Sequence, residues 1–204
     1  MRFPIRLPVL LVVALAGSAC GLIYRQDVNQ GNLVEQESVD LLKPGMTVVD
    51  LGAAPGSWSQ VLRERLGPSG RIVAVDVLPM DPIADVRFVQ ADFRSDEGLL
   101  AVERALDGVP VDLVVSDMAP NLSGIAISDQ ARSMALAELA RDFALDHLKP
   151  GGVFLVKVFQ GVGYDEFLKS LRGAFDKVVM RKPDASRDES AEQYLLARGP
   201  RRFG

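Results

Sequence analysis

The stretch from Asp50 to Trp58 places the strongest constraint on the fold of this chain. It reads Asp-Leu-Gly-Ala-Ala-Pro-Gly-Ser-Trp, and it joins an apolar run at residues 47–51 to a segment with helical spacing at residues 57–66. A strand, a glycine-containing turn and a helix in this order are typical of nucleotide-binding units in α/β proteins. Glycine lets the backbone approach a ligand closely, and the first amides of a helix are free hydrogen-bond donors. We therefore expect this turn to hold an adenosine-bearing cofactor.

The same alternation of apolar runs and helical segments continues along the chain. The expected strands are residues 47–51, 71–76, 86–92, 111–117, 153–159, 178–181 and 193–197, and the expected helices are residues 57–66, 128–148 and 164–175. Strands that alternate with helices predict an α/β fold with a mostly parallel sheet and helices on both faces.

Four aspartates mark one edge of this predicted sheet. Asp50, Asp76, Asp92 and Asp117 stand at the ends of expected strands, and α/β proteins bind ligands at the carboxyl ends of their strands. The turn lacks the G-x-G-x-x-G pattern that holds a pyrophosphate, which argues against a dinucleotide oxidoreductase. S-adenosylmethionine has no phosphate, and its ribose hydroxyls and adenine amine need acceptors that Asp76 and Asp92 supply. We therefore predict S-adenosylmethionine as the cofactor, with Asp50 ordering the turn.

Composition narrows the chemistry further. Cys20 is the only cysteine and His147 the only histidine, which excludes a cysteine-based zinc cluster and an intrachain disulfide and argues against Ser-His-Asp catalysis. No metal is expected, and His147 is expected to be solvated or to serve at a helix end rather than in catalysis. The formal net charge is -4, but residues 169–204 carry +4 and the preceding part -8. A polyanion is expected to meet the C-terminal third, although such a charge run is by itself typical of a solvated face.

Lys157 lies inside an expected strand that otherwise consists of Val, Phe and Leu. Burial of an amine among apolar side chains is costly unless the amine reaches a polar cleft. Methyl transfer from a sulfonium is an in-line displacement in which the acceptor hydroxyl must lose its proton. Lys157 is therefore the predicted general base, and the alternative is an edge-strand lysine that reaches into solvent.

Several motifs together resemble the FtsJ family. They are residues 50–59, Ser-Asp-Met-Ala-Pro-Asn at 116–121, Val-Lys-Val-Phe-Gln-Gly at 156–161 and Arg-Lys-Pro at 181–183. The resemblance spans residues 43–198. It implies a Rossmann-like S-adenosylmethionine-dependent methyltransferase fold with a seven-stranded sheet. It also implies methylation of a ribose 2'-hydroxyl of uridine in large-subunit ribosomal RNA, within the large ribosomal subunit, by a cytoplasmic and monomeric enzyme.

The resemblance also implies the site residues. The cofactor-binding positions fall on Gly56, Trp58, Asp76, Asp92 and Asp117, and the catalytic positions on Asp117, Lys157 and Glu192. Core packing for Trp58 and a solvated glutamate at position 192 stay open as alternatives. The family has a second catalytic lysine in a basic N-terminal segment, but here that place is Gly31, and no lysine precedes Lys43. This departure predicts a chain that binds the cofactor but methylates ribosomes weakly.

The N-terminus conflicts with a cytoplasmic enzyme. Residues 1–20 resemble a bacterial lipoprotein signal, because two arginines precede an apolar run at 7–16 and small residues precede Cys20. The run is too short to span a bilayer, and a buried N-terminal helix or strand is the alternative. Residues 21–32 resemble the mature start of the SmpA/OmlA family of outer-membrane lipoproteins.

We therefore expect a signal-like leader at 1–20, a linker or foreign segment at 21–42 and a methyltransferase domain at 43–204. One hypothesis is that two unrelated coding segments meet around residues 42–47, and a membrane partner is expected only if the leader is functional. Three functions stay open: the ribosomal RNA ribose methyltransferase, which we favour; a membrane-tethered lipoprotein with a non-catalytic nucleotide-binding body; and a methyltransferase acting on another RNA or a small molecule. Residues 118–127 and 183–191 are the loops expected to close on a substrate.

Overall fold

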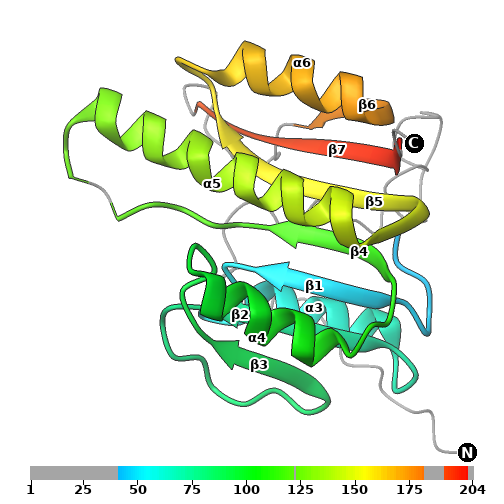
Figure 1. The fold of residues 1–204 in the computed structure, drawn as a ribbon. Helices are drawn as coiled ribbons and strands as arrows, with labels where there is room; N and C mark the ends of the chain where they lie inside the picture. Colours follow the sequence, from blue (N-terminus) through cyan, green and yellow to red (C-terminus); the bar gives the residue numbers. More distant parts are fainter. Residues whose placement is uncertain (1–40, 122, 182–190, 202–204) are drawn as a thin grey trace, which may run out of the picture.

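A computed structural model describes residues 41–121, 123–181 and 191–201 (Figure 1). The strands are β1 (Thr47–Leu51), β2 (Arg71–Asp76), β3 (Val86–Gln90), β4 (Val111–Ser116), β5 (Leu148–Phe159), β6 (Phe175–Arg181) and β7 (Glu192–Pro200). The helices are α3 (Ser57–Leu66), α4 (Asp96–Leu106), α5 (Ala126–His147) and α6 (Tyr164–Ala174).

The strands form one seven-stranded sheet in the order β3-β2-β1-β4-β5-β7-β6. The pairs from β3 through β5 are parallel, and β7 is antiparallel to both β5 and β6. The chain moves outward from β1 to β3 on one side and from β4 onward on the other, so the direction of winding switches between β1 and β4. Open α/β sheets bind their ligands at such a switch point, outside the carboxyl ends of the strands. The predicted mostly parallel, seven-stranded sheet is confirmed.

Helices cover both faces of this sheet, as predicted. In Figure 1, α4, α5 and α6 lie in front of the sheet and α3 lies behind it. Successive strand residues point to opposite faces, so Val49 packs in the core under α4, α5 and α6 while Val48 packs with Leu62 of α3. This two-sided burial explains why the strands are nearly continuous apolar runs rather than alternating ones.

The structure differs from the sequence prediction in several elements. Strands β6 and β7 are longer than predicted, and the other main differences concern α4, β3 and β5. Helix α4 was not predicted; it begins after Ser95, whose hydroxyl accepts the Gly98 N–H at 3.0 Å and caps the first turn. Strand β3 ends at Gln90, so Asp92 lies in the loop beyond it. Strand β5 begins at Leu148, directly after α5, because Leu148 is buried and pairs with Val111 across a register shift. Residues 149–152, which lie between the expected helix at 128–148 and the expected strand at 153–159, are therefore part of an irregular strand.

The predictions for the N-terminus fall outside the described residues. These are the signal-like leader with Cys20, the segment at 21–40 and the missing lysine at Gly31. Most of the expected loop at 183–191 also lies outside. Within the described ranges, no helix combines the length and the apolar character needed to cross a membrane.

Candidate active site

The turn between β1 and α3 is fixed by hydrogen bonds to the neighbouring strand. The Gly52 N–H donates to the Val75 carbonyl at 2.9 Å, and Gly56 caps α3 with a φ of 111° that favours glycine. At Gly52 a Cβ atom would lie 2.8 Å from the backbone of Met118. Glycine is thus needed at position 52 because two loops of the protein pack together there, a reason that the sequence did not reveal.

Asp76 lies at the end of β2 and anchors this turn. Its two carboxylate oxygens accept the N–H groups of Ala54, at 2.9 Å, and of Leu78, at 2.8 Å. Each carboxylate oxygen has two acceptor lone pairs, so each oxygen of Asp76 can accept one further donor. The two hydroxyls of a ribose supply such donors, and the geometry of Asp76 fits the predicted role.

Asp50 is fully buried beneath the same turn. One oxygen accepts the Ser59 hydroxyl at 2.6 Å, and no donor from the described residues reaches the other, Oδ1. Burial raises the pKa of Asp50 from an ordinary value of 3.8 to about 7; the Ser59 hydrogen bond opposes this rise, and the charges of Asp117 and Asp76 add to it. The bond to Ser59 of α3 agrees with the expected ordering role.

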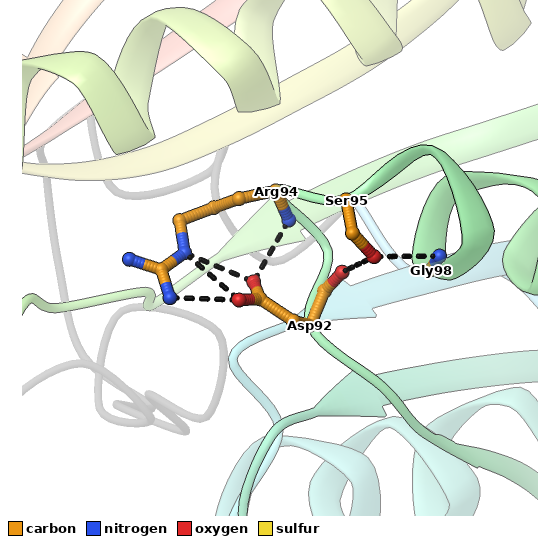
Figure 2. Close-up of polar contacts among 4 residues, drawn as sticks. All are labelled: Asp92, Arg94, Ser95 and Gly98. Atoms are coloured by element: carbon orange, nitrogen blue, oxygen red, sulfur yellow. Dashed lines mark hydrogen bonds and ion pairs between the residues drawn. The ribbon is translucent and has the colours of Figure 1, made fainter.

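Asp92 lies in an ion pair that the sequence analysis missed (Figure 2). The Arg94 guanidinium donates from Nε to Oδ1 at 2.9 Å and from Nη2 to Oδ2 at 2.7 Å, and the Arg94 N–H also donates to Oδ1. These hydrogen bonds hold the pKa of Asp92 down at about 2, so it is a charged acceptor. The Asp-x-Arg spacing before Ser95 was the available signal. Nε also donates to Oδ2 at 3.2 Å, so the amine of an adenine would share an oxygen of Asp92 with Arg94.

Asp117 and Lys157 meet at the carboxyl-end edge of the sheet. Asp117 follows β4, where its N–H donates to the Leu51 carbonyl at 2.9 Å. The Lys157 amine lies 2.7 Å from Asp117 Oδ1 and donates to the Asp117 carbonyl at 3.0 Å. The Lys157 side chain is 11% exposed and that of Asp117 30%, so the amine reaches a polar, partly open site. The alternative of a lysine extending into solvent does not describe Lys157.

Tyr194 completes this cluster and was not predicted from sequence. Its hydroxyl donates to Asp117 Oδ1 at 3.1 Å, and it stands opposite Lys157 in the antiparallel β5–β7 pair. Burial raises the pKa of the Tyr194 phenol well above its usual range, and the charges of Asp117 and Glu192 raise it further. The phenol therefore remains a donor at any working pH. A tyrosine two positions after Glu192 was the only signal in the sequence.

Glu192 begins β7, opposite Phe159. Because side chains two positions apart on a strand point to the same face, Glu192 lies on the same face as Tyr194. Its charge acts on the Tyr194 phenol, so the structure brings Glu192 to the cluster of Asp117 and Lys157 through that tyrosine.

Trp58 lies in the first turn of α3 and is 6% exposed. Its ring centroid is 6.3 Å from that of Tyr194, and it belongs to the core between α3 and the sheet. Core packing therefore describes most of the Trp58 surface, and contact with a cofactor stays a prediction. Among the described residues, no group of three His, Cys, Asp or Glu side chains is arranged to hold a metal ion.

Comparison with known proteins adds a family assignment to this geometry. The FtsJ-like methyltransferase family matches residues 33–200. A ribosomal RNA large subunit methyltransferase E from Methylobacillus flagellatus is 59% identical over 165 residues, which are 80% of each chain. The protein of the same name from an Azoarcus species is 62% identical over 156 residues, 76% of each chain.

A solved structure agrees with these sequence relatives. A crystal structure described as a ribosomal RNA methyltransferase from Plasmodium falciparum superposes with a TM-score of 0.71 at 27% identity, covering 82% of this chain and 92% of the other. The matched family covers well over half of the chain and contains every predicted site residue from Asp50 to Glu192. The chain belongs to the FtsJ-like methyltransferase family.

Proposed function

We propose that this chain transfers a methyl group from S-adenosylmethionine to a ribose 2'-hydroxyl of uridine in large-subunit ribosomal RNA. The observation that carries the proposal is the ion pair between Lys157 and Asp117, 2.7 Å apart at the carboxyl-end edge and partly open to solvent. The names of relatives at 59% and 62% identity support the RNA substrate. The methyl donor and the uridine ribose follow from the resemblance given above.

The cofactor would lie along the ends of β1, β2 and β3. Asp76 would accept the ribose hydroxyls, because each of its oxygens has a free lone pair, and Asp92 would accept the adenine amine. Gly56 and the first turn of α3 would lie against the methionine moiety, with Trp58 behind them. Asp117 borders this region from β4.

When bound, S-adenosylmethionine supplies a methyl group activated by a sulfonium. The acceptor hydroxyl would form a bond to the methyl carbon as the bond from sulfur to carbon broke, and its proton would go to the Lys157 amine, which must first lose the proton that it carries in the ion pair with Asp117. Asp117 positions the amine through two contacts, and the Tyr194 hydroxyl donates to the same Oδ1 of Asp117 that Lys157 contacts. Glu192 would help to orient the acceptor at the start of β7.

Partners and location follow from the substrate. We propose that the chain acts in the cytoplasm as a monomer, with large-subunit ribosomal RNA in the large ribosomal subunit as its partner. The +4 charge of residues 169–204 supports contact with RNA phosphates. A metal is not needed for methyl transfer from a sulfonium.

We propose that the absence of a lysine before Lys43 lowers the rate of RNA methylation but not the affinity for S-adenosylmethionine. If a cation near the N-terminus holds RNA in this family, Gly31→Lys should raise the rate on ribosomal subunits, while the affinity for S-adenosylmethionine stays the same. Full turnover of the unchanged chain, equal to that of a relative with the lysine, would refute this part of the proposal.

The decisive experiment uses large ribosomal subunits from cells that lack this modification, together with radiolabelled S-adenosylmethionine. Transfer of label into RNA, followed by nucleoside mass spectrometry, should yield 2'-O-methyluridine. Label on a base, or on RNA other than that of the large subunit, would overturn the proposed acceptor. Failure of the purified chain to bind S-adenosylmethionine in calorimetry would overturn the whole proposal.

A further inference from the structure

We infer that Asp50 is a specificity-determining residue, whose buried carboxyl favours the positively charged methyl donor over the neutral product that remains after methyl transfer. The inference rests on the proposed function, since it assumes that S-adenosylmethionine binds at the turn after β1. It adds a role for a residue that orders the turn but belongs to neither the proposed catalytic set nor the proposed cofactor ligands.

The charged groups around Asp50 come from each neighbouring element. Asp76 lies at the end of β2, Asp117 follows β4, and the charges of both act on Asp50. Lys157 of β5 is paired with Asp117. From α3 Asp50 accepts a hydrogen bond from a neutral group, the Ser59 hydroxyl, at 2.6 Å. When Asp50 is ionised, the turn after β1 is therefore bordered by the carboxylates of Asp50, Asp76 and Asp117, and the Lys157 ammonium is paired with Asp117.

Because Asp50 is buried, whether its carboxyl is charged depends on the groups around it. The side chain is 0% exposed, and its Oδ1 has no donor from the described residues. An unpaired carboxylate without solvent is costly, which is why the pKa rises to about 7. Near neutral pH the group therefore exchanges between a neutral and a charged form, and a small change in local charge decides which form prevails.

The donor and the product differ by one unit of charge. S-adenosylmethionine carries a sulfonium, an ammonium and a carboxylate, for a net charge of +1, whereas the product has a neutral thioether and a net charge of zero. A cation beside the turn favours ionised Asp50, so binding of the donor releases a proton. A unit charge at roughly 10 Å in a medium with an effective dielectric constant near 20 changes an equilibrium by about tenfold.

The sign of the pH dependence follows from this coupling. Below the pKa of about 7, free Asp50 is neutral and gives the donor no advantage. As the pH rises to about 7, Asp50 ionises and the affinity for the donor increases, and above that pH it levels off. Affinity for the product changes less, so the ratio of the two dissociation constants should rise about tenfold with pH. If Asp50 only anchors Ser59, this ratio has no reason to depend on Asp50.

The test is calorimetry on the full chain with S-adenosylmethionine and with S-adenosylhomocysteine, at pH values from 6 to 8.5. Measurement in buffers of different ionisation enthalpy counts the protons released. We expect the donor to release a larger fraction of a proton than the product near pH 7, and the ratio of dissociation constants to rise with pH. Equal proton release for both ligands in the unchanged protein would overturn the inference.

Asp50→Asn provides the matched variant, because it keeps the shape of the side chain and an acceptor for Ser59 but cannot ionise. Proton exchange that belongs to the ligands themselves persists in this variant, so the difference between the two proteins isolates Asp50. We expect the variant to bind both ligands with a ratio that Asp50 no longer makes pH-dependent. A pH-dependent ratio of the same size in Asp50→Asn would overturn the inference.

His147 is the only histidine of the chain, and it serves as a control. It ends α5, where its ring stacks on Phe143 and its Nε2 lies 3.2 Å from Glu103 Oε1. His147→Gln should leave the ratio of affinities unchanged. If neither ligand binds to the unchanged chain, the proposed function fails; if both bind without a difference in proton release, only the inference fails.

Discussion

Replacement of Lys157 tests whether this residue acts as a proton acceptor or only supplies a positive charge. Methionine keeps the length and the apolar stem of the side chain but removes the amine that lies 2.7 Å from Asp117 Oδ1 and 3.0 Å from the Asp117 carbonyl. Arginine keeps the positive charge but cannot give up its proton in a protein. If Lys157 is the general base, both variants should therefore lose activity, although only one of them loses the ion pair.

The magnitudes follow from the contacts. A positioned general base contributes roughly 10²–10⁴-fold to a rate, so both variants should methylate large subunits at least about a hundredfold more slowly. Loss of one partner from a buried pair costs about 3–5 kcal/mol. The cost should be smaller here, about 1–3 kcal/mol, because Asp117 is 30% exposed and keeps its bond to Tyr194. Lys157→Met should thus unfold at a lower temperature, by about 2–4 °C for each kcal/mol, and Lys157→Arg should be affected less.

The assay combines initial rates of label transfer to large subunits, calorimetry with S-adenosylmethionine, and thermal unfolding. Affinity for the cofactor should remain within a few-fold of that of the unchanged chain in both variants, which shows that the site is intact. Turnover by Lys157→Arg above about a tenth of the original rate would refute the reasoning, because a cation alone would then be sufficient.

Three further predictions test other parts of the structure. Tyr194→Phe removes the hydroxyl that donates to Asp117 at 3.1 Å but keeps the packed ring, so turnover should fall about threefold to tenfold with a loss of about 1 kcal/mol in stability; unchanged kinetics would show that the hydroxyl does not position Asp117. Gly98→Ala would place a Cβ atom 2.0 Å from the Asp92 carbonyl oxygen, so it should destabilise the protein by about 1–3 kcal/mol and weaken cofactor binding. Gly173→Ala, in α6 with open space around it, should instead stabilise the protein by about 0.5–1 kcal/mol in thermal unfolding. Equal effects of the two substitutions would contradict the packing argument. The pKa of Asp50 is raised to about 7 in the folded protein, so the folded state binds more protons than the unfolded state between about pH 4 and 7. The free energy of unfolding therefore falls as pH rises through this range, and in urea titrations the stability of Asp50→Asn relative to the unchanged chain should increase by about 2–3 kcal/mol between pH 5 and pH 8. A pH-independent difference would show that Asp50 does not titrate near neutrality.

Local pattern was sufficient for most elements of the fold. The strands at 47–51 and 71–76 and the helix at 57–66 are found with the predicted bounds, because each is a short apolar or helical run closed by glycine, proline or a charged residue. The bounds failed where a partner strand decides them. Strand β5 extends back to Leu148 only because Val111 lies beside it, and nothing near Leu148 in the sequence indicates that contact.

The site residues likewise divide into those that local sequence predicted and those that depend on contacts in the folded chain. Lys157 was predicted because an amine inside an apolar strand needs a polar cleft, and the structure places that amine on Asp117, 40 residues away in the sequence. The pairing of Asp92 with Arg94 was missed although the two are only two residues apart, because an Asp-x-Arg spacing on a loop is compatible with many geometries. Tyr194 was missed because its partner Asp117 lies 77 residues away.

The sequence by itself determined the alternation of strands and helices, the glycine turn at 52–56 and the aspartates at the strand ends. These depend on the periodicity of side chains and on backbone conformations that a few neighbouring residues decide. Only the tertiary structure decided which carboxylate is buried, which is paired and which remains open to a ligand. Asp50, Asp92 and Asp117 have the same side chain, yet burial gives the first a pKa of about 7, Arg94 gives the second a pKa of about 2 and Lys157 pairs with the third. The physical reason is that desolvation and charge depend on what lies within a few ångströms in space, and the strands that bring those groups together are distant along the chain.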